Sequence, residues 1–234
     1  MDLIVSAKKI VVVCGAGIST ASGISDFQTM YARDPNLKRA LSKKTVHTDA
    51  TRQALASFLL EFFTVKPQVS SVHRWLKRME DEQRIVRIYT MNVDGLEAAA
   101  GCKKVEFVHG RLDSEKPARC GNRHLSTEDI VSLSKRLTRW KEYETYHNCH
   151  IRPKIVLYGE NTRNIDGFEN DVRRCDLVLC LGTSLKVDPI RSLVLHAQKT
   201  RMVLVVTNER LSTTMWPTQM HIDLKNFERL FFQK

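Results

Sequence analysis

Two glycines directly after an apolar run mark the first stretch of the chain that could bind a ligand. Residues Ile10–Cys14 are apolar and of strand length, and Gly15 and Gly17 follow at once. A buried strand that turns in this way into a helix is a common phosphate site, because side chains at the glycines would collide with a pyrophosphate. A tight turn that binds nothing can need the same glycines. This stretch alone leaves both interpretations open.

The segment departs from the dinucleotide fingerprint of dehydrogenases. That fingerprint has a third glycine, and an acidic residue ends a second strand about 20 residues later. Thr20 stands where the third glycine is expected, and a polar segment without strand character follows Asp26, Phe27 and Gln28. A dinucleotide bound here would therefore not have its ribose held in the dehydrogenase manner.

Polar residues and glycines recur where the later strand-like runs end. The runs are Arg84–Met91, Lys104–Val108, Lys154–Tyr158, Leu177–Leu181 and Met202–Val206. The residues that follow them include Asn92, Asp94, His109, Gly182, Thr183, Ser184 and Asn208. In a parallel α/β sheet, ligands bind at the carboxyl ends of the strands, so these side chains should face one crevice. Any one of them could instead be an ordinary turn residue.

Helical patterns between the strand-like runs complete the predicted architecture. Apolar residues at helical spacing cover 50–63, another helix begins near Ser71 with Ser70 or Ser71 as its cap, and further candidates lie near 165–174 and 189–199. Residues 29–50 lack periodicity and are expected to form a loop. The alternation predicts an α/β fold, a Rossmann-like doubly wound parallel sheet with a second, smaller module.

The order and spacing of these motifs resemble the sirtuins, which are NAD-dependent protein lysine deacylases. The matching blocks are Gly15–Ser19, Ser22–Phe27, Asn92–Gly95, His109-Gly110, Arg152–Glu160, Gly182–Leu185 and Asn208. The resemblance implies NAD as cofactor and an acetyl-lysine protein as partner, from which the acetyl group passes to ADP-ribose as nicotinamide leaves. The blocks around Tyr89 and Ile155 look nearest to a nuclear fungal branch, so histone is one candidate substrate.

The resemblance assigns the catalytic roles to three residues. His109 would be the general base on a ribose hydroxyl, which suits an imidazole whose pKa lies near neutral pH. Asn92 would orient the ribose or a water molecule, and Asp94 would accept hydrogen bonds from the nicotinamide amide. Without the resemblance, His109 is a loop histidine, and Asn92 and Asp94 are helix-capping residues.

The resemblance also assigns residues to the cofactor. Ser19 and the nearby backbone amides would hold the pyrophosphate, whereas Thr183, Ser184 and Asn208 would contact the adenosine ribose and its neighbouring phosphate. The whole expected set is Gly15, Ala16, Gly17, Ser19, Asp26, Phe27, Gln28, Asn92, Asp94, Gly182, Thr183, Ser184 and Asn208. The hydroxyl groups could equally be satisfied by local backbone bonds.

Two positions in this set depart from the family pattern. Gln28 stands where the family has arginine, so the charge-assisted hydrogen bond that arginine offers is absent. Met91 stands where the family has glutamine, and a methionine side chain is a poor partner for a ribose hydroxyl. We expect weaker NAD handling, slower turnover or loss of activity compared with a typical member.

Residues 113–152 interrupt the alternation and form the predicted small module. Its candidate ligands for a structural zinc are Cys120, His124, His147 and Cys149. The family holds zinc here through two Cys-x-x-Cys pairs, but Arg123 stands at one cysteine position. Thiolates and imidazoles together suit zinc, although this spacing is not a standard one. The alternative is a degenerate module without metal, held by packing of Leu133, Leu137 and Trp140.

The domain prediction follows from these elements. Residues 1–112 and 153–234 form the NAD-binding domain, with 29–75 as a cofactor loop and helical insertion, and 113–152 form the small module. The longest apolar run near the N-terminus is too short for a signal or a membrane span, so we expect an intracellular protein, in the nucleus ahead of the cytoplasm. Six cysteines in that setting are read as thiols or metal ligands.

The net charge of +11 permits direct nucleic-acid binding without requiring it, because the basic residues are scattered rather than clustered. Two other functions remain open beside deacetylation. One is an NAD glycohydrolase or mono-ADP-ribosyltransferase. The other is a module that binds NAD or ADP-ribose without catalysis.

Overall fold

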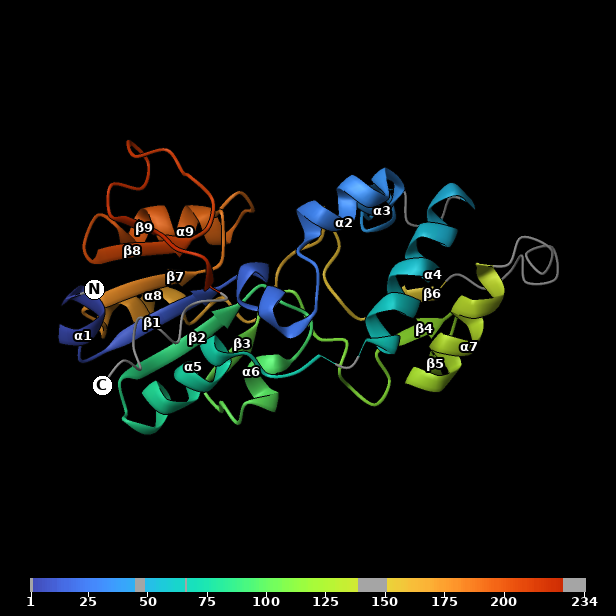
Figure 1. The fold of residues 1–234 in the computed structure, drawn as a ribbon, viewed down its shortest axis with the longest axis horizontal. Helices are drawn as coiled ribbons and strands as arrows, with labels where there is room; N and C mark the ends of the chain where they lie inside the picture. Colours follow the sequence, from blue (N-terminus) through green and yellow to red (C-terminus); the bar gives the residue numbers. More distant parts are fainter. Residues whose placement is uncertain (1, 45–48, 66, 139–150, 225–234) are drawn as a thin grey trace.

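The computed structural model describes residues 2–44, 49–65, 67–138 and 151–224, which form two lobes (Figure 1). A six-stranded, wholly parallel sheet in the order β3-β2-β1-β7-β8-β9 organises the first. Its strands are β1 (Ile10–Cys14), β2 (Ile85–Thr90), β3 (Val105–Phe107), β7 (Leu177–Leu181), β8 (Met202–Thr207) and β9 (Gln219–His221). The predicted Rossmann-like sheet is therefore confirmed, and β9 is a strand that the sequence pattern did not reveal.

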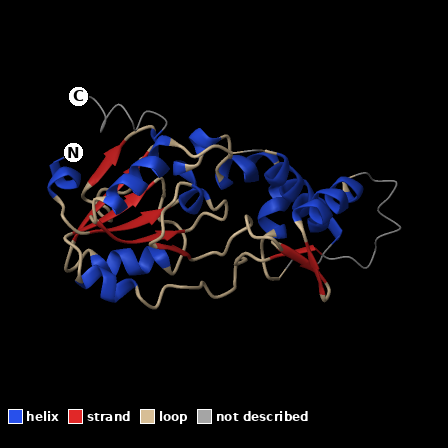
Figure 2. Ribbon diagram, turned by 90° about the horizontal axis from the view of Figure 1, so that it is seen from below, coloured by secondary structure: helices blue, strands red, loops and turns tan. Residues whose placement is uncertain are grey.

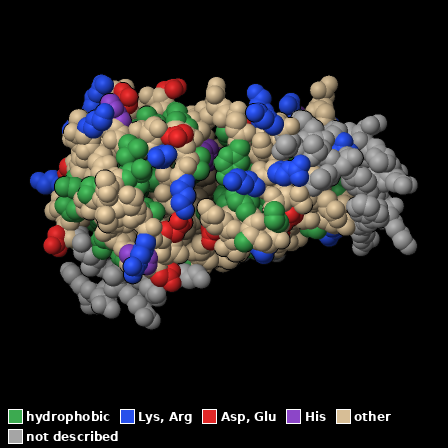
Figure 3. Space-filling model, turned by 90° about the horizontal axis from the view of Figure 1, so that it is seen from above, with side chains coloured by type: hydrophobic (Ala, Val, Ile, Leu, Met, Phe, Trp, Pro, Cys, Tyr) green, Lys and Arg blue, Asp and Glu red, His purple; other side chains and the backbone are tan. Residues whose placement is uncertain are grey.

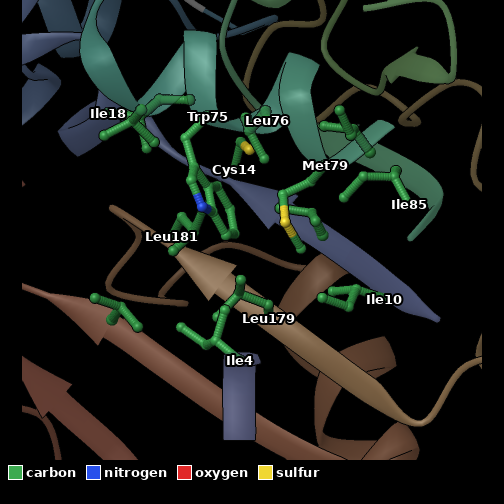
Figure 4. Packing of buried hydrophobic residues seen from close by; sticks show 14 of the residues in the cluster. Ile4, Ile10, Cys14, Ile18, Trp75, Leu76, Met79, Ile85, Leu179 and Leu181 are labelled. Atoms are coloured by element: carbon green, nitrogen blue, oxygen red, sulfur yellow. The ribbon is translucent and has the colours of Figure 1, made fainter. Parts of the chain in front are cut away.

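Helices cover both faces of this sheet. They are α1 (Asp2–Ser6), α5 (Ser71–Asp81), α6 (Leu96–Ala99), α8 (Phe168–Arg173) and α9 (Ile190–Ala197). Alternate residues of β1 enter two different cores: Val12 packs in the cluster that holds Trp75, and Val13 packs in the cluster that holds Val194. Because both faces are buried, the strand is a continuous apolar run. Figure 4 shows the first cluster, where Leu179 lies near Trp75 and Met79.

The second lobe, here called the helical lobe, combines two distant parts of the sequence. Its helices are α2 (Phe27–Arg33), α3 (Pro35–Ala40), α4 (Asp49–Thr64) and α7 (Thr127–Leu137), and its antiparallel sheet is β5 (Arg123–Leu125), β4 (Ala118–Cys120) and β6 (Ile151–Pro153). One core joins Leu55 and Leu59 to Leu125 and Ile130. Helices α3 and α4 of the 29–75 insertion thus share a core with the small module, and in Figure 2 the helices of this lobe lie close together beside its small sheet. The predicted domain boundaries stay a prediction.

The turn after β1 differs from the predicted helix. Two short 3₁₀ turns, Ala16–Ile18 and Thr20–Ser22, follow Gly15, and the chain turns at Gly23 with a φ of 87°. An α-helix therefore does not begin at the glycines, and a phosphate site in this turn stays a prediction.

The predicted 29–50 loop is also wrong for most of its length, because α2 and α3 occupy it. Asp26 caps α2 by accepting the Thr29 N–H at 2.9 Å, and Asp34 caps α3 by accepting the Asn36 N–H at 2.9 Å. These caps satisfy amides that a short helix leaves open, which compensates for weak periodicity. Of the two candidate caps of α5, Ser70 and Ser71, the structure shows Ser70 as the cap.

The predicted strand at 154–158 is an irregular connection between the lobes. It makes single bridges instead, Ile155 with Gly110 and Tyr158 with Ser42. Because the segment pairs first with one lobe and then with the other, it cannot run alongside a single neighbouring strand for its whole length. Its apolar residues Ile155 and Leu157 are buried in the helical-lobe core, which explains the strand-like pattern. Among the described residues, no helix combines the length and the apolar character needed to cross a membrane.

Leu179 tests the sheet packing because its side chain is wholly buried in the centre of β7. We predict that Leu179→Ala lowers the free energy of unfolding by about 3 kcal/mol, from lost burial and the cavity that remains. Urea denaturation measures the change. Val5→Ala is the control, since Val5 is 67% exposed and its truncation should change stability by less than about 0.5 kcal/mol. Equal effects of the two substitutions would contradict the assigned core.

Candidate functional site

A cavity of about 610 Å³ lies at the carboxyl ends of the parallel strands and is lined from both lobes. The predicted site residues that line it are Gly15, Ala16, Gly17, Asp26, Phe27, Gln28, Asn92, His109, Gly182, Thr183, Ser184 and Asn208. They come from the turns after β1, β2, β3, β7 and β8, and from the start of α2. Parallel strands end at one edge of their sheet, so residues far apart in the sequence meet there.

A small side pocket adjoins the main cavity and holds the other two predicted residues, Ser19 and Asp94. The two spaces share Ala16, Phe27, Asn92 and Val93 as lining. The structure therefore brings every residue predicted for catalysis or for the cofactor to one continuous region. It separates Ser19 and Asp94 from the turns after β7 and β8, which line only the main cavity.

The turn after β1 is packed against the turn after β7. A Cβ atom at Gly15 would lie 2.7 Å from the Gly182 carbonyl oxygen, and one at Gly17 would lie 2.8 Å from the Gly182 Cα. Gly182 itself has a φ of 63°, and its Cβ would lie 2.6 Å from the Ile18 nitrogen. Side chains are therefore excluded here by the neighbouring turn, which agrees with the tight-turn interpretation of the two that the sequence left open.

Most backbone amides in the first turn already have partners. Gly15 donates to the Leu181 carbonyl at 3.0 Å, and Gly17 donates to the Gly182 carbonyl at 2.9 Å. The N–H groups of Ala16, Thr183 and Ser184 make no hydrogen bond within the described residues. These three residues line the main cavity, so their amides are the backbone donors that remain for an anionic ligand.

His109 lies directly after β3 with its ring fixed by the backbone. Its Nδ1 is 3.1 Å from the Met91 carbonyl oxygen. Because a carbonyl only accepts, Nδ1 carries the ring proton and Nε2 is left as an acceptor. Burial lowers the pKa of His109, partly opposed by the bond to Met91, so the ring is neutral at pH 7. A neutral imidazole with a free Nε2 can act as a general base.

Asn92 and Asp94 meet through the Ser19 hydroxyl group. Asn92 Nδ2 donates to the Gly15 carbonyl at 3.2 Å and to Ser19 Oγ at 3.4 Å, and Ser19 Oγ donates to Asp94 at 2.7 Å. Asp94 also accepts the Leu96 N–H at 3.0 Å, so the helix-start contact expected from its sequence context exists as well. Burial raises the pKa of Asp94, and both of these hydrogen bonds oppose the rise.

The described half of the predicted zinc site does not fit one metal ion. In the β4–β5 hairpin, Cys120 pairs with Arg123, whereas Arg119 pairs with His124. Paired residues of antiparallel strands share a face and neighbours alternate, so Cys120 and His124 point to opposite faces. Cys120 also takes part in a disulfide bond, contrary to the expectation of thiols or metal ligands. His147 and Cys149 lie outside the described residues.

The family model described as "SIR2: Sir2 family" matches residues 15–189. The chain belongs to the Sir2 family. Its sequence is 30% identical to the NAD-dependent protein deacetylase hst4 of Emericella nidulans, over 96% of the chain and 44% of that protein. It is 34% identical to the NAD-dependent histone deacetylase SIR2 of Candida albicans, over 80% of the chain and 40% of that protein.

The chain thus spans less than half the length of these two fungal Sir2 relatives. A Staphylococcus epidermidis NAD-dependent protein deacetylase is 28% identical, with 87% of the chain and 83% of that protein covered. The solved structure "Sir2-p53 peptide-NAD+" has a TM-score of 0.73 and 26% identity, covering 98% of this chain and 94% of its own. These comparisons place the fold and the motif order within the Sir2 family.

The sequence analysis missed several residues of the Sir2-type cavity. Tyr31, Leu41 and Tyr158 line it from the helical lobe and from the connection between the lobes. The hydroxyl groups of Tyr31 and Tyr158 lie 3.3 Å apart. The block around Tyr158 was part of the recognised motif, but Tyr31 lies in the segment that was interpreted as a loop. Helix α2 brings it to the cavity.

The contact between the two glycine turns generates a binding prediction. We predict that Gly17→Ala abolishes the rise in melting temperature that ADP-ribose produces, because the new Cβ forces the turn after β1 away from Gly182. Gly167→Ala is the control, since its Cβ would meet only the Tyr89 hydroxyl at 3.4 Å and its φ is −78°. If Gly17→Ala keeps the full ligand-dependent shift, the close approach is not required for binding.

Proposed function

We propose that the chain is an NAD-dependent protein lysine deacetylase, which transfers the acetyl group of acetyl-lysine to ADP-ribose and releases nicotinamide. The observation that carries the proposal is the neutral His109 ring, whose Nε2 is free to accept a proton in a cavity that it shares with Asn92. The three open amides and the hydroxyl groups of Thr183 and Ser184 give that cavity donors suited to a phosphate and a ribose.

Each residue then has a defined task. NAD, when bound, supplies the ribose carbon that takes the acyl oxygen as nicotinamide leaves. His109 takes the proton of a ribose hydroxyl at Nε2, and Asn92 orients the ribose or a water molecule. Asp94 accepts hydrogen bonds from the nicotinamide amide in the side pocket, where apolar residues such as Phe58 and Phe62 exclude water.

The protein substrate enters between the lobes. The connection at 155–158 lines the cavity and forms bridges to Gly110 and to Ser42, and Tyr158 there is 42% exposed. A peptide that carries acetyl-lysine would lie against this backbone. Histone is the candidate favoured by the name of the Candida albicans relative, and nuclear location is proposed on the same ground. Bacterial relatives with the same activity in their names show that the site chemistry does not depend on that compartment.

A second reaction is favoured by the two departures from the family pattern. Gln28 and Met91 both line the main cavity, so the missing arginine and glutamine change the cofactor surface itself. An NAD glycohydrolase or mono-ADP-ribosyltransferase would use the same pocket without an acyl-lysine. A module that binds the nucleotide without catalysis would release no nicotinamide.

The proposed reaction requires neither nucleic acid nor a structural zinc ion. The basic side chains in Figure 3 are scattered and interleaved with acidic and apolar ones, which favours a diffusely basic surface over a nucleic-acid track. A structural zinc needs reduced Cys120 and a rearranged hairpin, so metal analysis of the protein under reducing conditions decides it. No step of the reaction depends on that metal.

The decisive assay supplies an acetylated histone peptide with and without NAD and follows all products by mass spectrometry. We predict free lysine peptide, nicotinamide and acetylated ADP-ribose in equal amounts, and only when NAD is present. His109→Ala should lower kcat/KM by about 100-fold or more, because it removes the base.

The control for folding is the melting temperature of His109→Ala with ADP-ribose, which should rise as in the parent. Nicotinamide release without acetylated ADP-ribose would identify the glycohydrolase or transferase reaction. Full activity of His109→Ala would show that His109 is not the general base.

A further inference from the structure

Acidic side chains outnumber basic ones on the lining of the cavity in which an anionic nucleotide would bind. The acidic side chains on the main cavity and the side pocket are Asp26, Glu160, Asp188, Glu209 and Asp94. Among the described residues, Lys186 is the only lysine or arginine on either lining. Gln28, where the family has arginine, is uncharged. A cation that meets the diphosphate of a nucleotide must therefore come from another position.

The turn after β7 places Lys186 at the cavity. Leu185 beside it is buried in the core that holds Val194, and the Leu185 N–H donates to Thr183 Oγ1 at 3.1 Å. Ser184 and Lys186, on either side of this anchored residue, both line the cavity. The open amides of Thr183 and Ser184 lie in the same turn, so neutral donors and an ammonium group come from one short segment.

Three of the four acids on the main cavity are held by groups other than Lys186. Asp26 and Asp188 each accept two hydrogen bonds from the first turn of the helix that follows. Glu160 forms an ion pair with Arg152 at 2.6 Å, and Arg152 does not line the cavity. These three acids therefore do not compete for the ammonium group.

Glu209 is the acid that does compete for it. Lys186 Nζ lies 2.8 Å from Glu209 Oε2, and the two side chains are 58% and 40% exposed. The Glu209 N–H donates to Thr207 Oγ1 at 3.3 Å, which keeps the residue at the end of β8. An exposed ion pair adds little to stability, so exchanging the carboxylate for a phosphate costs the fold little. A lysine ammonium group also has three donors on a flexible stem.

We propose that Lys186 binds the diphosphate of the nucleotide as the cation of this cavity, and that Glu209 weakens this binding by competing for the same ammonium group. The identity of the nucleotide rests on the proposed function, whereas the charge argument rests on the cavity lining. Lys186 is thus a binding residue, and the two members of one ion pair should affect affinity in opposite directions.

The first test is calorimetric titration of the full chain with ADP-ribose. Lys186→Met should raise Kd by about fivefold or more, because a charge-assisted hydrogen bond to phosphate is lost. Lys186→Arg should stay within about threefold of the parent, since it keeps the charge. The matched control is Lys199→Met, which removes the same charge from an exposed residue before β8, at the opposite edge of the sheet. It should change Kd by less than about twofold.

The second test is the opposite change in Glu209. Glu209→Gln should lower Kd by about twofold or more, because it frees Lys186 and removes a negative charge from the cavity. In a Lys186→Met background the same substitution should have a smaller effect, since no ammonium group is left to free. Without ligand, both single variants should melt within about 2 °C of the parent, as expected for an exposed pair.

The third test separates charge from shape. The ADP-ribose affinity of the parent should fall as NaCl rises, and Lys186→Met should reduce that dependence, because one charge contact is missing. With acetylated peptide, Lys186→Met should raise the KM for NAD by about the same factor as the Kd and leave kcat within about twofold, as expected for a residue that binds ground state and transition state alike.

Several outcomes would overturn the assignment. If the parent binds ADP-ribose and Lys186→Met binds it equally well, Lys186 is not the cation, and the proposed function still stands. Weaker binding in Glu209→Gln would make that carboxylate a ligand contact instead of a competitor. An equal loss in Lys199→Met would assign the effect to net charge alone. Absence of ADP-ribose binding in the parent would remove the proposed function together with this assignment.

Discussion

The close contact between the turns after β1 and β7 is the constraint on which the site depends. Gly17 and Gly182 touch through backbone atoms, and the Gly17 N–H donates to the Gly182 carbonyl at 2.9 Å. Because the first turn is fixed in this way, Ala16, whose amide is open, lines the cavity and Ser19 reaches Asp94. The glycines allow the two turns to pack closely, and this packing in turn shapes the cavity in which a ligand would bind.

A second constraint is the arrangement of polar and charged groups around the side pocket that holds Ser19 and Asp94. Asn92, Ser19 and Asp94 form one chain of hydrogen bonds, and Thr90 joins that chain to Glu97. Asp94 also accepts the Leu96 N–H, and Glu97 is wholly buried. Low dielectric makes such a network rigid when every partner is present. The geometry of the reacting residues is thereby tied to Glu97, a buried residue of α6.

The sequence predicted what repeated patterns and motifs encode. Five of the six strands of the large sheet were predicted from strand-like runs, and the cavity residues directly after those strands were predicted from the rule that ligands bind at strand ends. The sequence did not predict α2 and α3, because these helices are short and lack a clear apolar periodicity. Their N-termini are instead stabilised by the caps Asp26 and Asp34. It mistook 154–158 for a strand, because burial against the helical lobe produces the same apolar pattern. The placement of His124 failed because hairpin register decides which side chains share a face.

Calorimetric titration of the parent protein with ADP-ribose tests the central claim most directly, since this ligand contains both ribose rings and the pyrophosphate but needs no chemistry. The shared cavity predicts saturable binding of one ADP-ribose per chain, and the same stoichiometry with NAD. Absence of binding heat with both nucleotides, for protein that unfolds cooperatively, would contradict a nucleotide site at the carboxyl ends of these strands.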